Sequence, residues 1–248
     1  MPKQSTGSGP IVVLTGAGIS KQSGLDTFRC ADGISSRVNL EDVATPEGFA
    51  RNPMLVHEFY NARRSKLTDP SIRPNAAHTA LARLEQDWPG EMLIVTQNID
   101  DLHERAGSRK VLHMHGELKK VRCGRCGSIF AWTEDLGVAH ACAACGVVGK
   151  LRPNVVWFGE MPIGMDQIYD ALGRCSLFLS VGTSGNVYPA AGFVSHVRMN
   201  TRAHTVELNL EPSTGATLFA ETIYGPATDI LPEFVDAILT RRSSRVGT

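Results

Sequence analysis

The cysteines carry the clearest chemical pattern in this sequence. Cys123 and Cys126 form one CxxC pair, Cys142 and Cys145 form a second, and fifteen residues separate the two pairs. Thiolates at this spacing are typical of one tetrahedral zinc site, and four sulfur ligands leave no open position for water or substrate. The sequence therefore predicts a single structural Zn²⁺. The alternative is a pair of redox-active CxxC motifs, and we interpret His140 as a bystander.

A glycine-rich turn is the second pattern. The apolar run Ile11–Thr15 leads directly into Gly16–Ser20, whose sequence is GAGIS. Glycines after a strand let backbone N–H groups approach a pyrophosphate closely. The dinucleotide fingerprint is incomplete, because Lys21 occupies the position of the third glycine and no acidic residue follows a second strand at the expected distance. Taken alone, the turn fits either cofactor binding or a simple tight turn.

Polar residues also follow three further apolar runs. The runs and the residues after them are Met92–Thr96 with Gln97–Asp100, Leu177–Val181 with Gly182–Gly185, and Thr205–Leu208 with Asn209–Glu211. In a parallel sheet the carboxyl ends of the strands meet at one edge, which is where open α/β sheets bind ligands. Amide, hydroxyl and carboxylate groups gathered there suit a ribose, a carboxamide or a phosphate. The alternative is that they only cap helices.

The elements that must position these residues alternate along the chain. Short apolar runs are followed by helix-like stretches, which is typical of a parallel sheet covered by helices on both faces. The predicted helices are Ala76–Trp88, capped by Asn75, then Pro189–Met199 and Leu231–Leu239. The predicted fold class is therefore α/β, a Rossmann-like doubly wound parallel sheet with a smaller zinc-binding and helical module.

Two stretches interrupt this alternation. Cys30–Pro74 has the pattern of helices and loops, and Val121–Lys150 carries the paired cysteines. We interpret both as insertions that build the smaller unit of a single catalytic domain spanning residues 1–248. In this division the large unit comprises residues 10–29, 75–118 and 151–240, and the small unit comprises residues 30–74 (helical) and 119–150 (zinc).

Composition narrows the classes of partner. The 248 residues include 25 Lys plus Arg and 25 Asp plus Glu, and this zero net charge removes the broad positive surface of nonspecific nucleic-acid binders. The longest apolar runs are strand-sized, well below the roughly 20 residues that span a bilayer. Met1–Pro10 lacks the apolar segment of a secretory signal. We expect no membrane and no direct nucleic-acid partner, and a cytoplasmic protein whose cysteines bind metal.

Short motifs occur in a definite order around the paired cysteines. They are Gly16–Ser20 with Ser23-Gly24, Phe28-Arg29, Gln97–Asp100, His115-Gly116, Phe158–Glu160, Gly182–Ser184 and Asn209. In this order they resemble the sirtuin family, from about Ile11 to Leu239. The resemblance implies an NAD-dependent protein-lysine deacylase in which acyl-lysine enters between the two units. It also implies the products, which are free lysine, nicotinamide and O-acyl-ADP-ribose.

The resemblance assigns roles residue by residue. It implies that His115 is the base that activates a ribose hydroxyl, a task that suits a pKa near neutrality, with His113 as a decoy. The implied NAD contacts are Gly16, Ala17, Gly18, Ile19, Ser20, Gly24, Phe28, Arg29, Gln97, Asn98, Ile99, Asp100, Gly182, Thr183, Ser184, Asn209, Leu210, Glu211 and Ala227. Asp26 and Thr27 depart from the usual Pro-Asp, which puts in doubt any contact of that aspartate.

The substrate peptide is implied to pair as an added strand with one segment of the chain. The implied contacts are Val155, Val156, Phe158, Gly159 and Glu160. Recognition through the peptide backbone would tolerate varied sequences around the target lysine.

The acyl preference rests on two residues of a helix-like stretch. Tyr60 and Arg63 are three residues apart and so share a face, a spacing that resembles the desuccinylase and demalonylase subclass of sirtuins, of the prokaryote-like type. A guanidinium binds a carboxylate with two parallel hydrogen bonds, and a phenol adds a third. We expect succinyl and malonyl to be favoured and acetyl to be accepted. The alternative is an amphipathic helix with Tyr60 half-buried and Arg63 and Arg64 in solvent.

Three rival functions remain open at this point. A hydride-transferring NAD oxidoreductase would need the fuller glycine fingerprint. A non-enzymatic zinc-ribbon module acting on nucleic acid or protein is supported only by the basic residues Lys119, Lys120, Arg122 and Arg125. Protein ADP-ribosyl transfer on the same fold is the third.

Overall fold

The computed structural model describes residues 8–25 and 39–246 of the chain. The predicted NAD contacts Phe28 and Arg29 lie outside the described residues, as do Asp26 and Thr27. None of the helices in the described part is long and apolar enough to cross a lipid bilayer.

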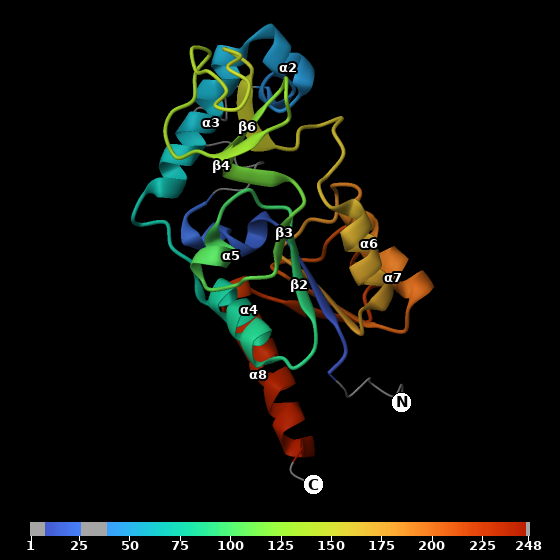
Figure 1. Cartoon of the computed structure of the whole chain (residues 1–248). Coiled ribbons are helices and arrows are strands. Elements are labelled where there is room, and N and C mark those ends of the chain that lie inside the picture. Colours follow the sequence, from blue (N-terminus) through green and yellow to red (C-terminus); the bar gives the residue numbers. More distant parts are fainter. Residues whose placement is uncertain (1–7, 26–38, 247–248) are drawn as a thin grey trace.

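A six-stranded parallel sheet forms the centre of the molecule (Figure 1). Its strands are β1 (Ile11–Thr15), β2 (Met92–Thr96), β3 (Val111–His113), β7 (Leu177–Val181), β8 (His204–Asn209) and β9 (Glu221–Tyr224). The order β3-β2-β1-β7-β8-β9 becomes 3-2-1-4-5-6 when these strands alone are numbered along the chain. That is the order of dinucleotide-binding Rossmann sheets, and it reverses direction between β1 and β7. The predicted fold class is confirmed.

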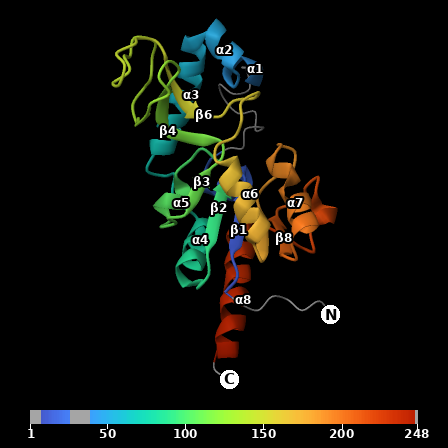
Figure 2. The same cartoon turned by 45° about the vertical axis from the view of Figure 1, so that its right-hand side comes forward.

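Two layers of helices cover the sheet. Helices α4 (Ala76–Asp87) and α8 (Ala227–Val246) pack on one face, and α6 (Met165–Arg174) and α7 (Phe193–Asn200) pack on the other (Figure 2). Val13 faces the α4 and α8 side, whereas its neighbour Val12 faces the α6 and α7 side. Because successive strand residues point to opposite faces, a strand buried on both sides must be apolar throughout, as β1 is.

The smaller unit lies beyond one end of this sheet (Figure 1). It contains a three-stranded antiparallel sheet of order β5-β4-β6 and, among its described residues, three α-helices. The elements are α1 (Leu40–Val43), α2 (Pro46–Arg51), α3 (Pro53–Thr68), β4 (Gly116–Cys123), β5 (Ile129–Ala131) and β6 (Leu151–Val155). Strand β6 pairs with β4, so Leu151–Val155 joins the small sheet, although the predicted division of the chain assigns residue 151 to the large unit. That division remains a prediction.

Most predicted elements recur with small shifts. The predicted bounds of β1, β2 and β7 match the structure, and Asn75 accepts hydrogen bonds from the backbone N–H groups of Ala77 and His78 as the N-cap of α4. The predicted helix Pro189–Met199 is instead a short 3-10 turn, Ala190–Gly192, followed by α7. Strands β3 and β9 escaped prediction because three or four partly exposed residues are too few for a clear apolar pattern.

Candidate active site and zinc site

The four predicted metal ligands form one cluster. The Sγ atoms of Cys123, Cys126, Cys142 and Cys145 all lie within 4.8 Å of one another. The Cys123–Cys145 pair is separated by 3.8 Å and the Cys126–Cys142 pair by 3.7 Å. A tetrahedral ion with Zn–S bonds of about 2.3 Å requires S–S edges of about 3.8 Å, so this arrangement fits a structural zinc ion.

Two glycines close the turns that carry these cysteines. Gly127 and Gly146 adopt φ values of 74° and 70°, which glycine reaches without strain. Their N–H groups donate to the carbonyls of Cys123 and Cys142 at 2.9 and 2.8 Å. Each CxxC pair is therefore held in its own hydrogen-bonded turn, independently of the other.

At the edge of the main sheet, the turns after β1 and β7 interlock. The N–H of Gly16 donates to Val181 O at 3.0 Å, and the N–H of Gly18 donates to Gly182 O at 2.8 Å. A Cβ on Gly18 would lie only 2.7 Å from Gly182 Cα, so a side chain would push the turns apart. These glycines thus bring two strand ends together at the switch point, whatever they contact in a ligand. The first turn continues as two 3-10 turns, Ala17–Ile19 and Lys21–Ser23.

Three predicted NAD contacts form a buried polar group at this edge. The Asn98 amide donates to Gly16 O and to Ser20 Oγ, both at 3.1 Å, and Ser20 Oγ donates to Asp100 Oδ2 at 3.0 Å. All three side chains are buried, and burial raises the pKa of the Asp100 carboxyl. Strand ends far apart in the sequence thus meet in one hydrogen-bonded group.

A second set of predicted contacts bridges the switch point. Gln97 Nε2 donates to Thr183 Oγ1 at 3.2 Å, and Asn209 Nδ2 donates to Thr183 O at 2.9 Å. The ends of β2, β7 and β8 are therefore linked through Thr183. Ser184 follows it and accepts a hydrogen bond from Thr214 N at 3.2 Å through its backbone carbonyl.

The remaining predicted contacts occupy different surroundings. The side chain of Ile19 belongs to the core of the main sheet, and Ile99 packs against the core of the small unit, so only their backbones face the polar edge. Gly24 ends the second 3-10 turn at φ 87°. Leu210 and Glu211 are exposed, and Ala227 is buried at the start of α8.

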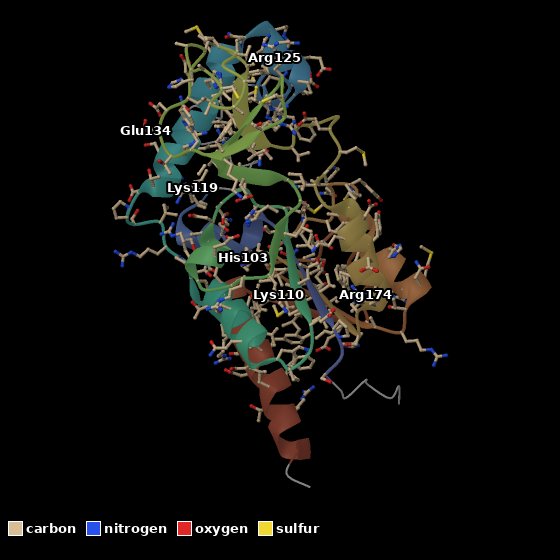
Figure 3. The ribbon with its side chains drawn as sticks, viewed as in Figure 1. His103, Lys110, Lys119, Arg125, Glu134 and Arg174 are labelled. Carbon is tan, nitrogen blue, oxygen red and sulfur yellow. The ribbon has the colours of Figure 1, made fainter. Side chains whose placement is uncertain are left out.

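Two buried histidines beneath this edge escaped the sequence analysis. His103, on α5 (Leu102–Arg105), places Nε2 3.0 Å from Thr15 Oγ1, and His78 places Nε2 3.5 Å from Ser20 Oγ. Figure 3 shows His103 close to the main sheet, whereas Arg125 lies out on the zinc module. Burial lowers the pKa of His78 to about 4 and that of His103 to about 3, so both rings are neutral. The N-cap pattern before His78 was the available signal, and His103 has none.

His115 lies between β3 and β4 with one ring nitrogen engaged. Its Nδ1 is 3.0 Å from Gln97 O, and because a carbonyl only accepts, Nδ1 carries the proton. The lone pair is therefore on Nε2, the atom that can act as a base. Burial lowers the pKa of His115, and the Gln97 carbonyl only partly opposes this, so the ring is neutral near pH 7.

The predicted peptide-binding segment continues from β6 beside His115. Val155 ends the strand, Val156 N donates to His115 O at 2.8 Å, and Phe158 is 61% exposed. Gly159 adopts φ 84°. The carboxylate of Glu160 accepts from Arg122, Arg152 and the backbone N–H of Trp157 at 2.6 to 2.9 Å. Only the backbone of Glu160 is therefore suited to a peptide contact.

Tyr60 and Arg63 lie on α3, with Tyr60 fully buried. The Tyr60 hydroxyl accepts a hydrogen bond from Trp157 Nε1 at 3.0 Å, and burial raises its pKa to about 12. The Arg63 guanidinium is partly buried and stacks 3.5 Å over the Phe59 ring. The alternative of a half-buried Tyr60 and a solvent-exposed Arg64 is wrong, because Tyr60 is fully buried and Arg64 is only 1% exposed and donates to Leu118 O at 3.1 Å.

Comparisons with known proteins extend over the whole architecture. Residues 16–189 match the Sir2 family. A curated relative from Salmonella typhimurium, an NAD-dependent protein deacylase, is 58% identical over 229 residues, covering 92% of this chain and 84% of the relative. A solved Sir2 homolog–NAD complex has a TM-score of 0.85 at 36% identity, covering 94% and 90% of the two chains. A Sir2 structure bound to an acetylated peptide has a TM-score of 0.76 at 28% identity, covering 93% and 92%.

Replacing one cysteine of the cluster tests the zinc site. We expect Cys142→Ser to reduce bound zinc well below one ion per chain and to lower the melting temperature by roughly 5 °C or more, because metal binding contributes folding free energy. Elemental analysis and differential scanning fluorimetry measure the two effects. Cys175→Ala, a buried cysteine outside the cluster, should keep its zinc. A Cys142→Ser protein with full zinc content would contradict the assignment.

Proposed function

The chain belongs to the Sir2 family and is an NAD-dependent protein deacylase, and from this premise we propose that it favours acidic acyl groups, succinyl and malonyl, on protein lysines. Acetyl is smaller than succinyl and malonyl, so we also expect it to be accepted beside Tyr60 and Arg63. The observation that carries the proposal is a buried phenol hydroxyl on the same helix as a partly desolvated guanidinium, at Tyr60 and Arg63. The hydride-transfer and non-enzymatic alternatives are set aside, because the relative at 58% identity is a deacylase.

The Tyr60 hydroxyl is arranged to donate a hydrogen bond. Because it accepts from Trp157 Nε1, its own proton is directed to another acceptor. With a pKa of about 12 the hydroxyl stays protonated throughout the physiological range. An acyl carboxylate is an acceptor of the required kind.

Arg63 supplies the matching positive charge. Burial lowers its pKa, which means that its guanidinium has lost part of its hydration. A partly desolvated guanidinium gains more free energy from an anionic partner than a fully hydrated guanidinium does. A neutral acyl chain carries no negative charge and therefore does not offset the lost hydration. Stacking on Phe59 uses the face of the guanidinium, and Nη1 also donates to Phe59 O at 3.4 Å, so a bound carboxylate would contact the edge of the guanidinium beside this bond.

The polar edge of the main sheet suits NAD by its chemistry. It presents the donors and acceptors of Ser20, Gln97, Asn98, Asp100 and Thr183 at the switch point where Rossmann sheets hold dinucleotides. We infer that these residues, with Gly16–Gly18, Gly182, Ser184 and Asn209, hold the cofactor. When bound, NAD supplies an electrophilic ribose carbon that loses nicotinamide and accepts the acyl oxygen.

The proposed chemical step of the protein is a proton transfer at His115. Nε2 accepts the proton of a ribose hydroxyl, while Nδ1–H stays on Gln97 O and keeps the ring in the correct tautomer. The hydrogen bond from Val156 N to His115 O joins the base to the segment proposed to bind the peptide. Base and substrate segment are therefore positioned by one stretch of backbone.

Acyl-lysine proteins are the proposed partners, and the solved Sir2 structure with an acetylated peptide supports this class of substrate. A cytoplasmic location stays a prediction from the paired cysteines, since thiolate metal sites persist in reducing compartments.

Matched peptides test the acyl preference. We expect Arg63→Met to reduce kcat/KM on succinyl-lysine by roughly 10- to 100-fold, because a bidentate charged hydrogen bond is lost, while acetyl-lysine changes little. Tyr60→Phe should cost about fivefold on succinyl only. Mass spectrometry of the peptides with and without NAD measures both, and exposed Arg73→Met is the control. Equal losses on both peptides would show that Arg63 does not read the carboxylate.

The pH dependence tests His115. A histidine whose pKa is lowered by burial is lost as a base only when the pH falls below that lowered value. We therefore expect the acid limb of kcat/KM to have its midpoint below the ordinary value of 6.5. His115→Ala should remove NAD-dependent deacylation. An acid limb centred above pH 7 would contradict a neutral, buried base.

A further inference from the structure

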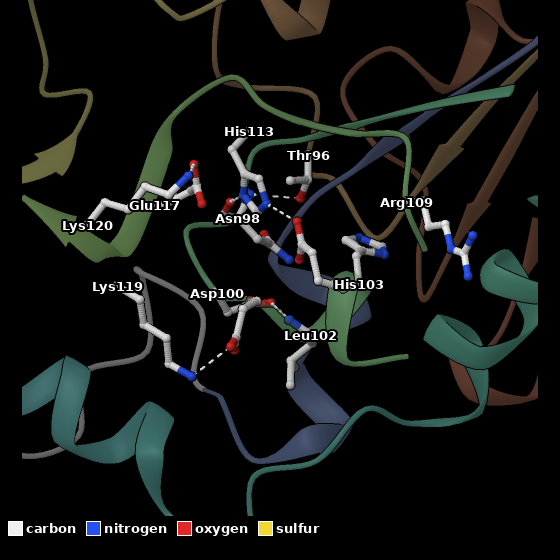
Figure 4. A network of polar contacts seen from close by, with 12 residues as sticks. Thr96, Asn98, Asp100, Leu102, His103, Arg109, His113, Glu117, Lys119 and Lys120 are labelled. Atoms are coloured by element: carbon white, nitrogen blue, oxygen red, sulfur yellow. Dashed lines mark hydrogen bonds and ion pairs between the residues drawn. The ribbon is translucent and has the colours of Figure 1, made fainter. Parts of the chain in front are cut away.

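Three successive carbonyls of the loop after β2 are held by the segment that contains His115. His115 Nδ1 donates to Gln97 O at 3.0 Å, and Leu118 N donates to Ile99 O at 2.8 Å. Between them, His113 Nδ1 lies 3.2 Å from Asn98 O (Figure 4). The loop carries the side chains proposed to face NAD, so these bonds decide where those side chains lie.

His113 differs from His115 in having acceptors at both ring nitrogens. Its Nε2 is 2.7 Å from the Glu104 carboxylate on α5, with only 8% of its side chain exposed and 42% of that of Glu104. A carbonyl and an ionised carboxylate can only accept, so satisfying both contacts requires a proton on each nitrogen. The geometry is that of an imidazolium ion paired with a carboxylate.

We propose that His113, held as an imidazolium by Glu104, is a positioning residue that fixes the Asn98 carbonyl and thereby the cofactor-facing loop beside His115. This rests on the proposal that His115 is the base. His113 itself touches neither cofactor nor substrate in this scheme. It acts through Asn98, whose amide binds Gly16 O and Ser20 Oγ at the switch point.

The charged groups around His113 favour its cationic form. Burial lowers its pKa, but the hydrogen bond and charge of Glu104, the Asn98 carbonyl and the charge of Glu117 together raise it above the ordinary value. The pKa of Glu104 is correspondingly lowered, although burial alone would raise it. Among the other neighbours, His103 is neutral, and burial keeps the pKa of Asp100 raised although the charge of His113 lowers it.

The nearby lysines are already paired. Lys119 binds Asp101 at 2.6 Å and Lys120 binds Glu117 at 2.7 Å, which leaves Glu104 as the direct partner of the ring (Figure 4). Glu104 is thus the carboxylate in direct contact with His113, whereas Glu117 acts on the ring through its charge.

This arrangement sets an alkaline limit on activity. Because the pKa of His113 is raised in the folded protein, its contribution is complete below the ordinary value of 6.5 and is lost as the pH rises through the raised value. Loss of one ring proton leaves either Asn98 O or Glu104 without its donor. With the acid limb of His115, kcat/KM should therefore be bell-shaped.

The experiment compares Glu104→Gln and His113→Gln with the parent, and uses Glu91→Gln, a remote exposed carboxylate, as the control. In Glu104→Gln we expect kcat on an acyl peptide to fall about five- to tenfold, with smaller changes in KM, and the alkaline limb to move to lower pH. His113→Gln keeps an amide donor for Asn98 O but cannot titrate, so it should lose the alkaline limb while retaining more activity than His113→Ala.

Nitrogen NMR of the ring separates this proposal from the function proposed above. As the pH is raised, both ring nitrogens of His113 should stay protonated to a higher pH in the parent than in Glu104→Gln. The measurement needs no turnover, so it can be repeated in His115→Ala, where failure of the base assignment would appear as retained activity. A His113 ring that loses its proton at the same pH in the parent and in Glu104→Gln, or a Glu104→Gln enzyme with the parent's kcat and pH profile, would overturn the proposal.

Discussion

Parallel pairing of β2, β1 and β7 is the constraint on which the site depends. The register places Thr15, Thr96 and Val181 side by side, so the residues that follow leave the sheet at the same height. The turns after β1 and β7 can then approach so closely at Gly18 and Gly182 that a Cβ atom on Gly18 would clash with the backbone of Gly182. Backbone hydrogen bonds of a sheet are repeated and mutually supporting, whereas side chains rotate. The sheet therefore fixes the positions of the turns, and the turns carry the polar side chains of the site.

Residues of one type acquire different properties from their surroundings. His113 and His115 are two positions apart, and their Nδ1 atoms donate to adjacent carbonyls of one loop, those of Asn98 and Gln97. A carboxylate at the second nitrogen makes one ring a cation, and burial without such a partner leaves the other neutral. Arg63 and Arg64 divide in the same way, because adjacent residues of a helix point in different directions. Arg64 bonds β4 from α3, while Arg63 stacks on Phe59.

The zinc cluster lies away from the proposed chemistry but is connected to it through the small sheet. Cys123 ends β4 and pairs with Leu151 at the start of β6, so the metal site adjoins the paired ends of these two strands. Within β6, the Arg152 guanidinium lies 3.2 Å from the centre of the Trp157 ring, and Trp157, which follows β6, donates to the Tyr60 hydroxyl. A displacement of β6 would therefore reach Tyr60, one of the two residues proposed to bind the acyl group, through packed side chains, which transmit strain because protein interiors are close-packed.

The sequence by itself determined what depends on neighbours along the chain. The strands β1, β2 and β7 were predicted with their bounds because a strand buried on both faces must be apolar throughout. The cysteine spacing predicted one metal site because all four ligands lie close together in the sequence. The order of short motifs was enough to predict the family. Phe28 and Arg29 stay predictions, as do the other assigned contacts.

Only the tertiary structure decided properties that depend on distant segments. Nothing local distinguishes His113 from His115, because the charge of His113 comes from Glu104 on another element. The burial of Tyr60 and Arg64 depends on Trp157 and Leu118, which lie more than fifty residues away in the chain. Protonation, burial and hydrogen-bond direction follow from the three-dimensional environment of a group, and a pattern of residue types contains that environment only where the partners are close in sequence.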